Sequence, residues 1–209
     1  MKHFKLLALS AAAALACSGA AVAGPQWTFA NVGLATGDGD EDFKTEFIGF
    51  EGCLAFADMF HVRGEWASGE NLESEGLDVD ILQFGAGLHR SISDNTDVSI
   101  DVFFGTIDET LPGFGPIESD YTGYSFGVRS MLTDQFEFNA AVNYADVDCP
   151  AAAACGLGDI GLSAVNVGGE IGGRYLFDKA ISVGAGLNFN GVQGDLLTLD
   201  VRWAFGDVF

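Results

Sequence analysis

Hydrophobic and polar residues alternate along most of the chain after residue 26. Within 60–70, for example, Phe60 and Val62 have one parity, whereas His61 and Arg63 have the other. Successive side chains of a β-strand point to opposite faces, so this period of two predicts strands with one apolar and one polar face. Ten segments show the pattern: 26–36, 44–58, 60–70, 82–90, 97–105, 123–132, 136–144, 165–177, 181–189 and 197–205.

The first of these segments is the least regular. Trp27 and Phe29 have one parity, and Val32 and Leu34 have the other. A β-bulge near Asn31 would bring all four side chains to the same face, because a bulge inserts one extra residue into a strand. We therefore expect a bulge here if the apolar residues of this strand share one face.

The links between the ten segments alternate in length. Short links fall at 57–59, 91–95, 133–135 and 178–179, and longer ones at 37–42, 69–76, 108–119 and 148–160, with an intermediate one at 190–194. This alternation is typical of antiparallel strands whose two rims face the periplasm and the outside. The sequence thus predicts an all-β fold, an antiparallel up-and-down transmembrane β-barrel of ten strands, with eight as the alternative number.

The apolar face could meet lipid, or it could form the core of a soluble β-sandwich with the same alternation. The opposite face favours the barrel, because it is rich in glycine, which suits a crowded lumen. It also carries charges of both signs, which can neutralise one another inside a narrow barrel. The predicted lumen charge network comprises Arg63, Glu65, Asp101, Arg129, Glu137, Glu170, Arg174, Asp200 and Arg202.

Residues 1–23 are typical of a cleaved secretory signal peptide. Two lysines precede an apolar run over 6–16, and the small-residue motif Ala-Val-Ala follows it. Cleavage there leaves 24–209 as the barrel domain. The alternatives are a membrane anchor, for which the run is shorter than the roughly 20 residues needed, and a lipoprotein acylated at Cys17.

The chain is strongly acidic and yet apolar in its average composition. Loss of the two lysines in the signal peptide takes the net charge from −21 to −23. Such a charge argues against binding of nucleic acid. The chain holds 29 glycines and 18 phenylalanines, and its mean hydropathy is positive. An apolar chain without a second long apolar run must bury its apolar groups or show them to lipid on alternating strands.

The chain ends on an alternating apolar segment. Its apolar positions are Leu199, Val201, Trp203, Phe205 and the terminal Phe209. Together with the signal peptide and the strand pattern, this segment resembles the small outer-membrane β-barrels of Gram-negative bacteria, of the opacity-protein and OmpA transmembrane-domain type. The resemblance implies outer-membrane localisation, a monomer without cofactor, and a last strand that is recognised by the barrel-assembly machinery. Asp207 departs from the family pattern, which has an apolar residue there.

Three segments that we expect to be long loops are acidic: 37–42, 69–80 and 107–120. Carboxylates are ligands for hard divalent cations, which could bridge the protein to lipopolysaccharide phosphates. The alternative is an ordinary solvated surface. In the loop at 148–160, Cys149 and Cys155 could form a disulfide in an oxidising compartment. A zinc site there would need more ligands, and no histidine lies nearby.

Candidate catalytic chemistry is sparse. His89 and Ser91 have the H-x-S spacing of an outer-membrane lipid A deacylase family, but the sequence offers no third acid to orient the base. We expect His61 to join the charges of the lumen. The prediction is therefore a non-enzymatic outer-membrane barrel with a structural and surface-interaction role and at most a narrow pore for small solutes. The alternative is a lipid-modifying barrel enzyme.

Overall fold

The computed structural model contains ten β-strands. It describes residues 27–38, 44–56, 59–71, 78–111, 115–148, 164–178, 180–190 and 194–205. The strands are β1 (Phe29–Asp38), β2 (Lys44–Phe56), β3 (Phe60–Asn71), β4 (Asp78–Ser93), β5 (Thr96–Leu111), β6 (Gly115–Thr133), β7 (Phe136–Asp148), β8 (Ala164–Leu176), β9 (Ile181–Asn190) and β10 (Gly194–Ala204).

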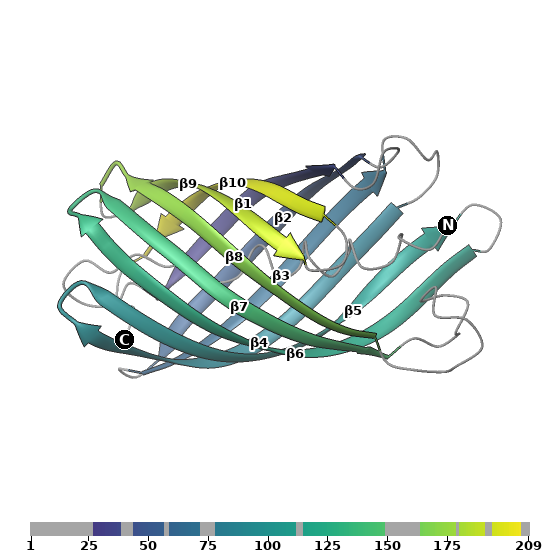
Figure 1. The fold of residues 1–209 in the computed structure, drawn as a ribbon, viewed down its shortest axis with the longest axis horizontal. Helices are drawn as coiled ribbons and strands as arrows, with labels where there is room; N and C mark the ends of the chain where they lie inside the picture. The colour runs from purple at the N-terminus through teal and green to yellow at the C-terminus, as the bar shows by residue number, and fades with distance from the viewer. Residues whose placement is uncertain are drawn as a thin grey trace.

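The strands form one closed barrel. Each strand pairs antiparallel with the next along the chain, and β1 pairs with β10 to close the sheet (Figure 1). The predicted fold class and the ten strands are confirmed, and the alternative of eight is wrong. Phe29 at the start of β1 lies opposite Ala204 at the end of β10. The first and last strands therefore begin and end at the rim with the short links.

The outer surface of the barrel is apolar. Exposed side chains from all ten strands face outward, among them Leu34, Phe50, Trp66, Phe84, Ile100, Phe126, Val142, Ile171, Leu187 and Leu199. The residues that alternate with these along each strand point into the barrel and are mostly buried. A soluble sandwich would bury the apolar face instead, so that alternative is wrong. An apolar outer band is what a barrel needs against hydrocarbon, where backbone groups must be paired within the protein.

The polarity of the two faces inverts within single strands, above the apolar band. In β4, outward positions change from Asp78 and Asp80 to Leu82, while inward positions change from Val79 and Ile81 to Gln83. The same alternate residues of the strand face outward throughout; what changes along the strand is the medium outside the barrel. The outside of the barrel here meets water or headgroups, so polar residues face outward and apolar residues face inward.

This inversion corrects two expectations about the longer links. β5 extends to Leu111 and β6 starts at Gly115, so most of the expected loop at 107–120 is strand. The expected loop at 69–80 likewise loses its ends to β3 and β4. The acidic residues of these segments are therefore largely on strand ends. The sequence interpretation ended the strands where the apolar residues changed face.

The expected bulge near Asn31 is wrong. β1 pairs in continuous register with both β2 and β10. Phe29 and Asn31 are consequently both buried in the lumen, while Leu34 faces outward. The parity conflict in the sequence arises because the aromatic residues at the start of this strand fill the barrel interior rather than face lipid.

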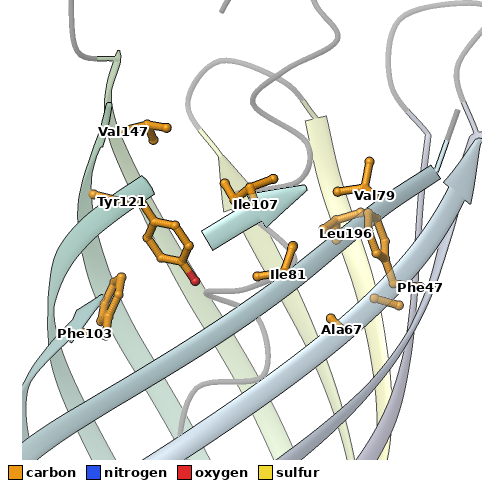
Figure 2. Close-up of a cluster of buried hydrophobic side chains, with 11 residues drawn as sticks. Phe47, Ala67, Val79, Ile81, Phe103, Ile107, Tyr121, Val147 and Leu196 are labelled. Carbon is orange, nitrogen blue, oxygen red and sulfur yellow. The ribbon is translucent and has the colours of Figure 1, made fainter. Parts of the chain in front are cut away.

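The inside of the barrel has an apolar layer that the polar-face interpretation did not include. Eleven buried residues form it: Ala35, Phe47, Ala67, Val79, Ile81, Phe103, Ile107, Tyr121, Ala145, Val147 and Leu196. Figure 2 shows these side chains pointing inward from strands around the barrel. They come from the strand halves near the longer links, whereas most of the lumen charges lie closer to the short links.

Several predicted features lie outside the described residues. These are the signal peptide, Cys17, the pair Cys149 and Cys155, and the terminal Phe209. Of the described cysteines, Cys53 is buried as a free thiol. In the described part of the chain, no helix is long and apolar enough to cross a membrane.

Candidate functional site in the barrel lumen

All nine residues of the predicted lumen charge network point into the barrel. Eight of them are buried, and Asp200 is half-buried. Their positions follow from strand parity alone. The structure shows in addition which of these side chains are in contact. Some of the contacts join strands that are not neighbours, which the sequence pattern does not predict.

Two ion pairs of the lumen join strands that are not neighbours. His61 Nε2 on β3 lies 2.6 Å from Asp101 Oδ1 on β5, and both side chains are buried. Gly87 on β4 stands directly between them in register. Arg174 on β8 and Asp200 on β10 form the second pair, with 2.5 Å between Nη2 and Oδ1.

Glycine again occupies the strand between in the second pair. Gly184 on β9 is in register with Arg174 on one side and with Asp200 on the other. A Cβ at Gly184 would collide with the Asp200 carboxylate and the Arg174 guanidinium, and one at Gly87 would collide with His61 and Asp101. We call this arrangement a glycine-bridged pair: two inward side chains that meet over a glycine of the middle strand.

The same arrangement occurs twice more. The Arg63 guanidinium lies 5.3 Å from the centre of the Phe103 ring, and Gly85 stands between the two residues. Tyr121 donates a hydrogen bond of 2.9 Å to Gln83 Oε1 across Gly105.

These four glycines have a direct geometric role. Neighbouring strands are about 4.8 Å apart, so strands two apart are about twice that distance, and side chains must cross the middle strand to touch. Any Cβ on the middle strand would occupy that path. At these four positions, glycines of the inner face predicted from the sequence coincide with side-chain contacts of the lumen.

Other lumen residues make shorter-range contacts. Arg129 Nε and Nη2 donate to the two oxygens of Glu137 on the adjacent strand, at 3.2 and 3.3 Å. Arg202 lies 3.9 Å from the centre of the Phe29 ring. Glu170 is within electrostatic range of Arg63 and Arg202. Arg129, Arg202 and Glu170 thus each lie near a group of opposite charge or near the face of an aromatic ring.

The His89–Ser91 pair does not form a nucleophile and base in this arrangement. His89 is buried in the lumen, and its Nδ1 lies 3.2 Å from Nδ1 of His61. Ser91 is exposed and donates a hydrogen bond of 2.7 Å to Asp97 Oδ1. Sequence reasoning placed His61 among the lumen charges but did not find its contact with His89. The signal that could have found it is the shared inward parity of two histidines on adjacent strands.

Solved structures with a similar fold are outer-membrane barrels. An outer-membrane channel from Pseudomonas putida F1 is 8% identical, with a TM-score of 0.55 over 90% of this chain and 98% of that one. The NanC porin is also 8% identical, with a TM-score of 0.51 over 83% of this chain and 100% of that one. No protein-family model and no curated protein matches the sequence. At this identity the likeness concerns the fold.

The fold and the lumen define the class of this protein. It is a closed, ten-stranded antiparallel barrel with a lipid-facing apolar band and a charged interior. Its structural neighbours are barrels of the bacterial outer membrane. The outer-membrane localisation expected from the sequence agrees with both observations.

The glycine-bridged pairs lead to a stability prediction. Gly184→Ala places a methyl group between Arg174 and Asp200, and we expect it to lower the free energy of unfolding by about 1–3 kcal/mol. Gly52→Ala is the matched control, because a Cβ at Gly52 meets nothing within 4 Å. The stability of both variants is measured by urea unfolding in lipid vesicles, with the heat-dependent gel shift as the readout of the folded fraction. Equal stability of the two variants would contradict the idea that the missing side chain of Gly184 leaves room for the ion pair.

Proposed function

We propose that this chain is an integral outer-membrane barrel with a structural and surface-interaction role, and that its lumen passes at most small solutes. The observation that carries the proposal is the set of glycine-bridged pairs, whose buried side chains meet over a middle strand and occupy space on the inner side of the wall. Barrels of about eight strands are filled by their own side chains, whereas about sixteen leave a channel. Ten strands stand nearer to the filled end.

The names of the structural neighbours are the reason why the proposal includes a narrow passage for small solutes. The two compared structures are named as a porin and as an outer-membrane channel. The opacity-protein and OmpA type remains our preferred family, on the sequence features of the signal peptide and the last strand. Recognition of that strand by the barrel-assembly machinery and a monomeric state belong to the same proposal.

Single-channel recording in a planar bilayer tests the width of the lumen. We expect the refolded barrel to be silent or to give small, rare steps. Phe103→Ala removes a ring from the apolar layer and should increase the conductance. Phe104→Ala is the control, since the neighbouring Phe104 faces outward. Large steps from the unchanged protein would overturn the proposal of a closed or narrow lumen.

The outer ends of the strands support a role at the membrane surface. Exposed carboxylates face outward above the apolar band on β2 to β7, and we call them the acidic belt: Glu46, Glu70, Asp78, Asp80, Asp108, Glu118, Asp120 and Asp148. Several lie directly opposite one another, as Asp108 does with both Asp80 and Glu118. Like charges in that position destabilise a sheet. No described lysine or arginine side chain lies within the belt.

We propose that divalent cations relieve this repulsion and link the acidic belt to lipopolysaccharide phosphates. In bilayers that contain lipopolysaccharide, Mg²⁺ should raise the unfolding midpoint of the barrel. A triple variant, Asp80→Asn, Asp108→Asn and Glu118→Gln, should lose most of this gain and be more stable than the parent in EDTA. Asp94→Asn, at a short turn, is the control. An equal Mg²⁺ effect in all three proteins, or one that is undiminished in phosphatidylcholine vesicles, would contradict the link.

The alternative function is a barrel enzyme that modifies outer-membrane lipid. Against it stand the separate hydrogen bonds of His89 and Ser91, and the position of His89 inside the lumen rather than on the lipid face. We expect mass spectrometry to find the same lipid A in cells that lack the protein and cells that express it. A mass shift that disappears with His89→Asn would favour the enzyme.

A further inference from the structure

A tryptophan is held at the short-link end of the lumen. Trp27 is fully buried and immediately precedes the barrel wall. The next residue, Thr28, is fixed from both sides: its carbonyl oxygen accepts a bond of 2.9 Å from the Phe205 N–H, and its hydroxyl accepts one of 3.3 Å from the Ala55 N–H. The backbone is therefore anchored at Thr28, and what holds the indole of Trp27 in the lumen is its side-chain surroundings.

Trp27 stacks on two histidine rings, and it also belongs to a buried cluster with Phe29 and Cys53. The indole stacks on the His89 ring at 4.0 Å between ring centres and 15° between planes, and on the His61 ring at 4.7 Å and 21°. Arg129 lies 4.7 Å from the centre of the indole. Because one flat ring rests on both imidazoles, its position requires that the two imidazoles stay side by side.

The two imidazoles are joined by one hydrogen bond. Their Nδ1 atoms are 3.2 Å apart, and their ring centres are 5.4 Å apart. The centre-to-centre distance is nearly the largest that this nitrogen separation allows, so the two nitrogens point at each other. Ligands of one metal ion would instead converge on a point beside that line. Within the described residues, no three His, Cys, Asp or Glu side chains are grouped as metal ligands.

Only one proton can lie between the Nδ1 atoms of His61 and His89 in this hydrogen bond. His61 Nε2 donates to Asp101, so its Nδ1 either accepts from His89 Nδ1–H or, when His61 is a cation, donates to a bare His89 Nδ1. Both arrangements keep the rings side by side. When both imidazoles are cations, two N–H groups face each other and the bond cannot exist. His89 Nε2 is buried without a hydrogen-bond partner among the described residues, so nothing on its far side holds the ring.

The charged groups around the histidines set how easily the second proton enters. Burial is the largest factor that opposes a positive charge on His89, and a protonated His61 and Arg129 on β6 oppose it as well, whereas Asp97 and Asp101 on β5 favour it. Arg63 on β3 also faces Asp101, and Glu137 on β7 is paired with Arg129. A second proton at this contact would place two N–H groups face to face, so the second protonation is the step that breaks the contact.

We propose that Trp27, His61, His89 and Asp101 form a proton-operated latch that closes the short-link end of the lumen and releases the indole of Trp27 when both imidazoles are protonated. The release of Trp27 is independent of whether the lumen conducts. Any effect on passage rests in addition on the function proposed above.

Acrylamide quenching of tryptophan fluorescence tests the latch. The chain has three tryptophans, and Trp66 and Trp203 face outward. In a Trp66→Phe, Trp203→Phe barrel in lipid vesicles, we expect weak quenching at high pH because Trp27 is buried. The quenching constant should rise at least two-fold as the pH falls from about 7 to about 4, because burial of His89 opposes the second protonation. A constant that does not change over this range would overturn the proposal.

Variants of the latch separate histidine from carboxylate titration. His89→Asn removes the second proton site, and quenching in this variant should not depend on pH. Asp97→Asn keeps both imidazoles, so the rise should persist and occur at lower pH. A pH-dependent rise in His89→Asn would assign the change to another group and overturn the latch. If Zn²⁺ at high pH produced the full change, the site would be a metal site rather than a proton site.

A measurement on the unchanged barrel covers the case in which His89→Asn fails to fold. The barrel domain 24–209 contains only two histidines, so its ¹⁵N-imidazole NMR signals belong to the latch. The second of the two imidazole protonations should occur over the pH interval in which quenching rises; a different interval would contradict the latch. Planar-bilayer recording at the two pH extremes adds a separate result. A moving Trp27 with unchanged conductance would leave the latch standing and count against passage through the lumen.

Discussion

The interior of this barrel depends on side chains that meet over a strand lying between them. Among the described residues we identify four contacts of this kind, each with a glycine on the middle strand: Gly85, Gly87, Gly105 and Gly184. The contacts tie each strand to its second neighbour as well as its first, which backbone hydrogen bonds cannot do. Because hydrocarbon outside the barrel gives no hydrophobic incentive for the wall to collapse inward, the interior contacts carry the shape of the lumen.

The same constraint explains how strong charges are tolerated inside. A buried ion loses its hydration and needs a close partner to offset that loss. Arg174 reaches Asp200 at 2.5 Å, and His61 reaches Asp101 at 2.6 Å, only because a glycine leaves the path open. The glycine of the middle strand is therefore part of each ion pair, although it carries no charge.

Strand number and lumen-facing positions could be predicted from the sequence because both follow from a period of two. The strand ends could not, because the interpretation followed polarity rather than parity. Between Ile81 and Leu82 the apolar residues change from the inner to the outer face without any change in backbone geometry. The pairing of lumen charges was equally out of reach, since it depends on register across three strands. The inward turn of Phe29 was missed because aromatic residues were expected to meet lipid.

The charges inside the barrel are arranged differently from those on its outer surface near the longer links. Inside, the carboxylates of Asp101, Glu137 and Asp200 each lie close to a histidine or an arginine. Outside, Asp108 lies between Asp80 and Glu118, and like charges face each other across successive strands. Folding alone gives no reason to keep that repulsion, because neutral residues at the same positions would make a more stable sheet. This cost is the reason for our proposal that cations and lipid headgroups outside the chain interact with the negative charge.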